Sequence, residues 1–387
     1  DALTDADNNV AIGTLALSAE TNNNGNTAVG AEALKVQNVG NGSDARNTAV
    51  GFAAGTAVTT GIQNTLVGAL AGDALQDADF NVAIGTDALA IDTLGSRSVA
   101  IGRRALAAQN FTSATDTYNV AVGFEAGNDI TTGVQNTLIG GLAGDALTDG
   151  SNNVALGINA LSSDIRGSKA TAIGSGALAT QGFASATDTY NTAVGFNSGV
   201  SVTTGRFNNL FGALAGDALT AGDSNTAIGY VSLSSDTKGE RAVAVGEGAL
   251  FTQNFTSETN NYNTAVGYNA GYAVTTGIQN TFVGGLAGDA TDDGAYNVAV
   301  GHLALSANCG NSNIAIGYDA LLLYTGASSI GIGSDAFASL TSGAANVATG
   351  FQAGLFATTA DNSTFIGYQA GKGITGAKLT GNNNTAV

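Results

Sequence analysis

The residues best suited to chemistry in this sequence are aspartates that recur in short acidic clusters. One cluster contains Asp73, Asp77 and Asp79, and a second contains Asp145 and Asp149. Carboxylate oxygens are the ligands that Ca²⁺ prefers in proteins, so these five residues are the candidate metal ligands. Their spacing changes between clusters, which a strict coordination site would not tolerate, and solvated acidic turns are the alternative. We predict no other cofactor.

No residue pattern indicates catalysis. His302 is the single histidine and Cys309 the single cysteine, so no disulfide holds the fold. A catalytic histidine needs partners in a pocket, and a polysaccharide-cleaving solenoid needs paired carboxylates in a cleft. The acidic positions drift too much for such a pair. We therefore predict no catalytic residue and a protein that is not an enzyme.

Aspartates and basic residues also lie close together at three regularly spaced places. We interpret them as exposed ion pairs, which contribute about 0–1 kcal/mol each and set solubility and register. The three groups are Asp92 with Arg97, Asp164 with Arg166 and Lys169, and Asp236 with Lys238 and Arg241.

Three related segments, 111–118, 183–190 and 255–262, begin with Phe and end with Tyr. Aromatic side chains on exposed protrusions are favoured anchors for a partner. The alternative is that the rings fold back and pin each segment to the body of the protein. The candidate contact residues are Phe111, Tyr118, Phe183, Tyr190, Phe255 and Tyr262.

All these residues must be positioned by one repeat that runs through the whole chain. The pattern Asn-x-Ala-Val/Ile-Gly-x-x-Ala-Leu/Gly occurs 21 times, and its fifth position is always Gly. Most copies follow one another at about 17 residues, and in the middle of the chain every fourth interval is longer. The result is a super-repeat of four coils, about 72 residues long, that relates Gly51, Gly123, Gly195 and Gly267. Such a period sets the architecture.

Each repeat is too short to be a domain but fits one coil of a parallel β-solenoid, with two short strands and two turns. Positions 2 and 4 of a repeat face the same side of a strand and position 3 faces the other. None of these positions carries a charge, so both faces of the strand are expected to be buried. One face lines the coil interior, and the simplest cover for the other is a neighbouring chain.

Other positions of the repeat also have structural roles. The glycine at position 5 indicates a corner that needs positive φ or close backbone approach. The asparagine at position 1 is suited to turn bonds and to an amide ladder between coils. Large residues at position 3, such as Leu138, coincide with Gly at position 9, which indicates that stacked coils share the interior volume. The four extra residues of every fourth coil are expected to form loops.

The predicted fold is therefore all-β, a parallel solenoid of about 21 coils of 16–21 residues each. We expect one continuous array over residues 1–387, cut at both ends from a longer one. It comprises a partial coil (1–8), two coils (9–46), three quartets of coils (47–118, 119–190 and 191–262) and less regular coils (263–387).

Composition excludes several classes of function. The net charge is −18, with no basic stripe that could neutralise phosphates, so we predict no nucleic-acid partner. No apolar run approaches the roughly 18 residues of a membrane span. Thr59 and Thr60 recur as a pair only once in each quartet of coils, whereas an ice-binding solenoid would present threonine on every coil.

Residues 81–89 and 98–106 resemble the head repeat of trimeric autotransporter adhesins, and residues 275–288 resemble repeats of phage tail-fibre proteins. The resemblance implies a left-handed parallel β-roll, three chains side by side and a role in attachment. The coil here is longer than the usual head coil and carries periodic insertions.

The sequence thus predicts a segment of a non-enzymatic extracellular fibre on a cell or virion surface. It would form a homotrimer and bind a host surface or matrix receptor. The alternatives are a phage tail-fibre shaft, a self-assembling filament subunit, and a solenoid that binds calcium or ice.

Overall fold

The computed structural model describes residues 6–40, 43–374 and 379–387, and these contain strands, turns and irregular backbone but no helix. They form a parallel β-solenoid of about 22 turns, which confirms the predicted all-β fold. Residues 1–5 of the expected partial first coil lie outside the described residues. The chain divides into two compact units, Asp1–Asn191 and Thr192–Val387.

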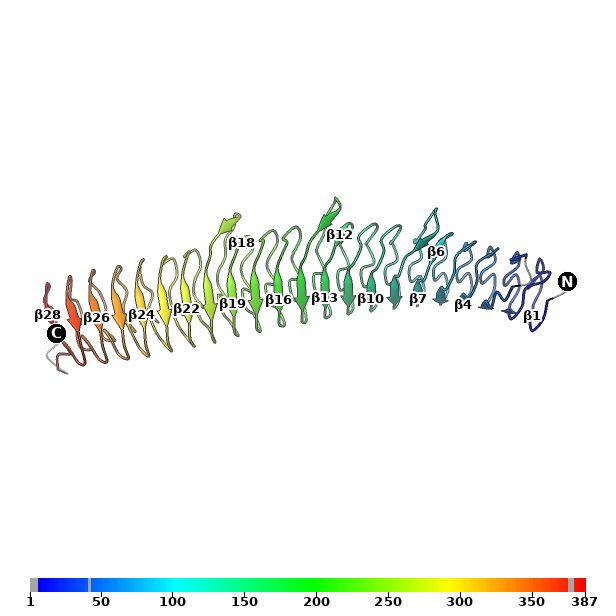
Figure 1. Cartoon of the computed structure of the whole chain (residues 1–387). Coiled ribbons are helices and arrows are strands. Elements are labelled where there is room, and N and C mark those ends of the chain that lie inside the picture. The colour runs from blue at the N-terminus through cyan, green and yellow to red at the C-terminus, as the bar shows by residue number, and fades with distance from the viewer. Residues whose placement is uncertain (1–5, 41–42, 375–378) are drawn as a thin grey trace. The chain divides into compact units, whose positions relative to one another are not determined.

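Each coil contributes one short strand to a parallel sheet, and the strands of a unit follow one another in Figure 1 as a ladder of arrows. The first unit contains β1 (Val10–Ile12), β2 (Thr27–Val29), β3 (Thr48–Val50), β4 (Thr65–Val67), β5 (Val82–Ile84), β7 (Val99–Ile101), β9 (Val120–Val122), β10 (Thr137–Ile139), β11 (Val154–Leu156) and β13 (Thr171–Ile173). The second unit contains β15 (Thr192–Val194), β16 (Asn209–Phe211), β17 (Thr226–Ile228), β19 (Val243–Val245), β21 (Thr264–Val266), β22 (Thr281–Val283), β23 (Val298–Val300), β24 (Ile314–Ile316), β25 (Ile330–Ile332), β26 (Val347–Thr349), β27 (Thr364–Ile366) and β28 (Thr385–Ala386).

Successive strands pair in strict register, position by position. Between β10 and β11, Thr137 pairs with Val154, Leu138 with Ala155 and Ile139 with Leu156. The middle residue of the three-residue strands from β2 to β27, such as Leu138, is fully buried inside the coil, whereas its two neighbours face outward. In β1 the middle residue, Ala11, is exposed. The predicted alternation of positions 2, 3 and 4 is therefore confirmed.

The expected second strand of each coil is not formed in most coils. The strand covers only positions 2–4, and turns make up the rest of a typical coil. In the coil that begins at Asn136, which has no second strand, the backbone enters the left-handed region at Leu142 (φ 57°), Gly144 (φ 56°) and Asn152 (φ 61°). Left-handed residues cannot continue an extended strand, so the chain turns where a second strand was predicted.

The corner glycines satisfy both requirements that the sequence indicated. Gly140 has a φ of +135°, and a Cβ added to it would lie 2.5 Å from the carbonyl oxygen of Gly157 in the next coil. Gly317 has the same φ and the same 2.5 Å distance to the carbonyl oxygen of Gly333. Only a residue without a side chain fits at this corner.

The side-chain amides of the asparagines at position 1 bond mainly to backbone groups, and less often to one another. Asn136 Nδ2 donates to the carbonyl oxygen of Gly150 at 2.9 Å, which closes its own coil. Asn136 Oδ1 accepts the backbone N–H of Asn153 at 3.0 Å. The amide ladder predicted from the sequence is therefore mainly a side-chain-to-backbone ladder, with both amide groups used inside the protein.

Large interior side chains take the volume that glycine leaves free in adjacent coils. A Cβ added to Gly127 or Gly144 would lie 2.7 or 2.8 Å from the methyl groups of Leu138. Phe282 has the same relation to Gly271, at 2.8 Å. The predicted exchange of volume between position 3 and position 9 is confirmed, as expected for an interior packed without voids.

Candidate partner-contact site

The insertions of three quartets form small parallel ladders beside the main sheet. Their strands β6, β12 and β18 project beyond the turns of neighbouring coils (Figure 1). The pairs are β6 (Gly95–Ser96) with β8 (Thr115–Asp116), β12 (Gly167–Ser168) with β14 (Thr187–Asp188), and β18 (Gly239–Glu240) with β20 (Thr259–Asn260). Each insertion is thus built on two successive coils.

The two aromatic residues of each insertion have different environments. Phe111 is only 7% exposed and anchors the start of its loop, whereas Tyr118 is 51% exposed. Phe183 and Phe255 are buried in the same way, and Tyr190 and Tyr262 are exposed. The fold-back alternative therefore describes the phenylalanines. The tyrosines remain accessible as candidate contact residues.

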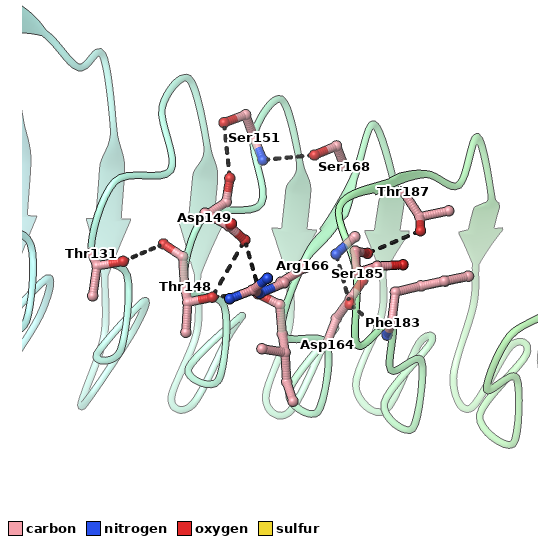
Figure 2. A network of polar contacts seen from close by, with 12 residues as sticks. Thr131, Thr148, Asp149, Ser151, Asp164, Arg166, Ser168, Phe183, Ser185 and Thr187 are labelled. Carbon is pink, nitrogen blue, oxygen red and sulfur yellow. Dashed lines mark hydrogen bonds and ion pairs between the residues drawn. The ribbon is translucent and has the colours of Figure 1, made fainter.

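The predicted exposed ion pairs of Asp92, Asp164 and Asp236 are wrong, because all three carboxylates are fully buried. Asp164 Oδ1 accepts the backbone N–H groups of Gly167 at 2.9 Å and Phe183 at 3.3 Å. Its Oδ2 accepts Nε2 of Gln181 at 2.5 Å. Figure 2 shows Asp164 beside the backbone of Phe183. The carboxylate therefore serves donors of the insertion, and the charge is held by hydrogen bonds.

Burial of the equivalent carboxylate of Asp236 has an electrostatic cost. Burial raises the pKa of Asp236, while the donors from Gln253, Phe255 and Gly239 act in the opposite direction.

A signal for these buried acids was present in the sequence. Four acids at equivalent places of the super-repeat are each followed one coil later by a glutamine: Glu20 and Gln37, Asp92 and Gln109, Asp164 and Gln181, and Asp236 and Gln253.

One basic residue near each of these acids contacts the exposed part of the loop instead. Arg97 forms an ion pair with Asp116. Its guanidinium carbon lies 5.2 Å from the ring centre of Phe80 and 5.9 Å from that of Tyr118. Arg241 lies over Tyr262 at 5.7 Å. Cation–π contacts of this kind fix the orientation of an exposed ring.

Lys169 has the same relation to the second loop. Its Nζ donates to Asp188 at 2.6 Å and to the hydroxyl oxygen of Tyr190 at 3.1 Å. The hydrogen bond to Asp188 raises the pKa of Lys169, and the same bond lowers the pKa of Asp188. Both groups are exposed, so this is a surface ion pair whose main effect is to hold the tyrosine.

Three of the five candidate calcium ligands are engaged by the protein. Asp77 accepts the hydroxyl of Thr60 at 2.7 Å, and Asp79 accepts the backbone N–H of Ile62 at 2.8 Å. Asp149 lies 3.7 Å from Arg166 (Figure 2).

The other two candidates, Asp73 and Asp145, are half-buried, and burial raises the pKa of both carboxyl groups. Among the residues that the structure describes, no three His, Cys, Asp or Glu side chains are grouped closely enough to hold a metal ion. Calcium binding stays a prediction from the sequence.

Threonine hydroxyls of the turns donate along the solenoid. Thr131 Oγ1 donates to the carbonyl oxygen of Thr148 at 3.2 Å, and Thr148 Oγ1 donates to that of Ile165 at 3.0 Å (Figure 2). His302 stacks on Tyr318 with ring centres 5.7 Å apart. These side chains reinforce contacts between coils.

The outer face of each parallel sheet carries no charge and is uncovered in the single chain, with mainly Thr or Val at position 2 and mainly an apolar residue at position 4. Position 4 is a large apolar residue that is more than one-third exposed in many coils. In the first unit these residues are Ile12, Val50, Ile84, Ile139 and Leu156; in the second they are Phe211, Ile228, Val266, Val283, Ile316, Ile332 and Ile366. Contiguous exposed apolar surface on a folded protein marks a contact site.

Comparison with known proteins gives no relative: no protein-family model matches the sequence, and no curated protein matches it. Over the described part of the chain, no helix is long and apolar enough to cross a membrane.

Proposed function

We propose that this chain is a segment of a non-enzymatic extracellular fibre, in which the coils form a shaft and the loops form an attachment surface. The observation that carries the proposal is the uncovered, uncharged face of the parallel sheet, with its column of exposed apolar residues at position 4. Parallel sheets are normally covered on both faces. A face without charge, repeated coil after coil, fits a partner that repeats with the same period.

The partner that we propose for this face is further copies of the same chain, three in all. Ten stacked strands of three residues present about 500 Å² at ~3.3 Å per residue and ~4.8 Å per strand. Two such faces bury about 1,000 Å² together, which is the size at which specific protein interfaces begin. The resemblance to trimeric adhesin heads supports three chains.

Light scattering on the purified chain tests the assembly. The expected mass is three times the chain mass of 37.9 kDa. Replacing both Ile139 and Leu156 by Glu places charges on the outer face of adjacent strands and is expected to give monomers. A monodisperse monomer of the unaltered chain would contradict the proposal.

Ile91 and Ile165 provide the matched control, because they lie in turns away from this face. Ile165 is 44% exposed, against 43% for Leu156. Replacing Ile91 and Ile165 together by Glu adds the same charge and is expected to leave the oligomer intact. Dissociation of this control variant as well would mean that charge alone, and not the sheet face, decides assembly.

The attachment role rests on the tyrosines that stand exposed at the loops. Tyrosine offers a large contact area with few rotatable bonds, which suits recognition of a partner. The proposed partner is a receptor on a host surface or in its matrix, and the owner is a bacterial cell or a phage. Replacing Tyr118, Tyr190 and Tyr262 together by Ala is expected to reduce binding to host cells at least tenfold.

The matched control for attachment replaces exposed tyrosines outside the loops, Tyr230, Tyr268 and Tyr318, by Ala. Binding by this control should match the unaltered chain. Equal losses in both triple variants would remove the loops from the proposal and leave the shaft.

A further inference from the structure

A second column of buried side chains runs through each unit, in the turn opposite the strand. Its residues lie eleven positions after the first residue of each repeat from Asn9 to Asn263, and all of these are fully buried. In most of the array they follow one order: an acid, a glutamine, a β-branched residue and a leucine. The column reads Glu20, Gln37, Val58, Leu75, Asp92, Gln109, Ile130, Leu147, Asp164, Gln181, Val202, Leu219, Asp236, Gln253 and Val274.

The acid and the glutamine form a directed chain of hydrogen bonds with an asparagine of the next coil. Gln109 Nε2 donates to Asp92 Oδ2 at 2.5 Å, and Gln109 Oε1 accepts Nδ2 of Asn119 at 2.8 Å. Asp92 Oδ1 accepts the backbone N–H groups of Gly95 at 3.1 Å and Phe111 at 3.0 Å. Each amide therefore has one orientation, because the carboxylate only accepts.

The same chain occurs at the other three longer coils that precede Asn263. Gln181 Nε2 donates to Asp164 at 2.5 Å and Gln181 Oε1 accepts Asn191 at 2.8 Å. In the second unit, Gln253 joins Asp236 at 2.6 Å to Asn263 at 2.8 Å. Gln37 makes the longer equivalent bonds to Glu20, at 3.5 Å, and Asn47, at 3.1 Å.

The strands themselves cannot distinguish one coil from the next. Val-Ala-Ile of β5 and β7 and Val-Ala-Val of β9 are nearly the same. Pairing a strand with the wrong coil would lose few strand contacts, and register is weakly specified in such a sheet. A buried carboxylate placed against a valine or leucine, however, would lose its donors and be strongly disfavoured.

We propose that each acid–glutamine–asparagine chain is a polar key that fixes the register of the coils and the point at which the insertion leaves the solenoid. The acid holds the first residue of the loop, the glutamine identifies the coil that carries it, and the asparagine joins that glutamine to the coil that follows. Buried polar groups are retained for such specificity in other repetitive folds. The key thereby places Tyr118 and Arg97, but its role does not depend on what the tyrosine binds.

Hydrogen exchange of the intact chain, followed by mass spectrometry, tests the key. The variant Asp92→Val with Gln109→Leu copies the apolar pairs found elsewhere in the same column, so the coils still pack. Amides of residues 111–118 are expected to exchange at least tenfold faster, while those of β3, β4 and β10 keep their native rates. The control variant Ile130→Val in the same column is expected to change neither region.

Asp92→Asn provides a second test with almost no change in volume. The new side-chain amide presents a donor to Gln109. The amide group of Gln109 must then flip so that its oxygen faces this donor, and it can no longer accept the hydrogen bond from Asn119. Faster exchange is therefore expected at residues 111–118 and also at Asn119. Native exchange of the loop in both variants would overturn the proposal. A uniform acceleration across all coils would overturn it too, because that result belongs to general packing.

Discussion

The coils of a quartet and the coils near residues 297–345 share one strand design but fill the opposite turn differently. In the quartets that turn contains the polar key, as at Asp92 and Gln109. In the later coils it contains Cys309, Tyr324 and Leu340, which are also buried. Before Asn263 the key occurs at every coil that carries an insertion, so buried polarity follows the loop there and is not needed by the solenoid.

Tyr324 shows how a coil without an insertion satisfies its turn. Its hydroxyl lies 2.9 Å from the carbonyl oxygen of Ala327, 2.8 Å from Ser329 Oγ and 2.7 Å from the carbonyl oxygen of Gly343. One neutral side chain thus joins two successive turns. A buried carboxylate is required only where extra backbone N–H groups need an acceptor.

Substitution of a corner glycine in each region tests whether both regions depend equally on the corner that they share. Replacing Gly140 or Gly317 by Ala should reduce the free energy of unfolding by about 3 kcal/mol or more, because each combines positive φ with a backbone clash. The losses should be similar, since both added Cβ atoms would lie 2.5 Å from a carbonyl oxygen. Denaturant unfolding measures both.

Gly141 is the control for this comparison. A Cβ at this position would meet nothing within 4 Å, so Gly141→Ala is expected to change the free energy of unfolding by less than about 0.5 kcal/mol. If Gly140→Ala and Gly141→Ala behaved alike, the corner would not be the common element of the two regions.

The region without a key should depend on the hydroxyl group of Tyr324. Tyr324→Phe is expected to lower the free energy of unfolding by about 1–3 kcal/mol, because buried carbonyl groups lose their donor. Tyr318→Phe removes an exposed hydroxyl from the same coil and should have no measurable effect. Equal stability of both variants would show that the later coils need no polar contact in this turn.

Asp236, the buried acid of one key, should make stability depend on pH as pH rises above about 4. Burial raises the pKa of Asp236, so its stabilising contribution is complete below the ordinary value of about 3.9 and is lost as pH rises through the raised value. The melting temperature should therefore fall as pH increases. Asp236→Asn is expected to flatten this dependence.

The later coils supply the contrast in the same experiment. Burial raises the pKa of Tyr324 above its ordinary value near 10, so this residue does not titrate between about pH 4 and 7. Tyr324→Phe should therefore keep the pH slope of the unaltered chain. Parallel curves for Asp236→Asn and the unaltered chain would remove the buried acid as the cause.

Much of the coil was predictable because its signals are local and repeated. A glycine in every copy at one position, as at Gly140, indicates the corner, and uncharged strand positions such as Leu138 indicate the interior. A large residue at position 3, such as Leu138, coincides with glycine at position 9, such as Gly144. The residue types alone therefore indicate that the two positions share interior volume. Each of these signals depends on neighbours one repeat away, so the period itself identifies the contacts.

The key was missed because an aspartate beside an arginine suggests an exposed ion pair, as at Asp92 and Arg97. Acids are seldom fully buried, and only the geometry of the turn shows that Asp92 faces Gln109 while Arg97 faces Asp116. The single strand per coil was missed for a related reason. Left-handed backbone at leucines such as Leu89 has no signature in residue type.

The four-coil order of the inner column makes length an adjustable property of this protein. Removing residues 119–190 as a block would bring Tyr118 before Asn191, just as Tyr190 precedes it now. Every side chain of the buried column would meet a neighbour of the kind it already has. Recombination between whole blocks can therefore shorten or extend the array and keep the order of the buried column, whereas loss of the coil that carries a glutamine would leave its acid without that partner.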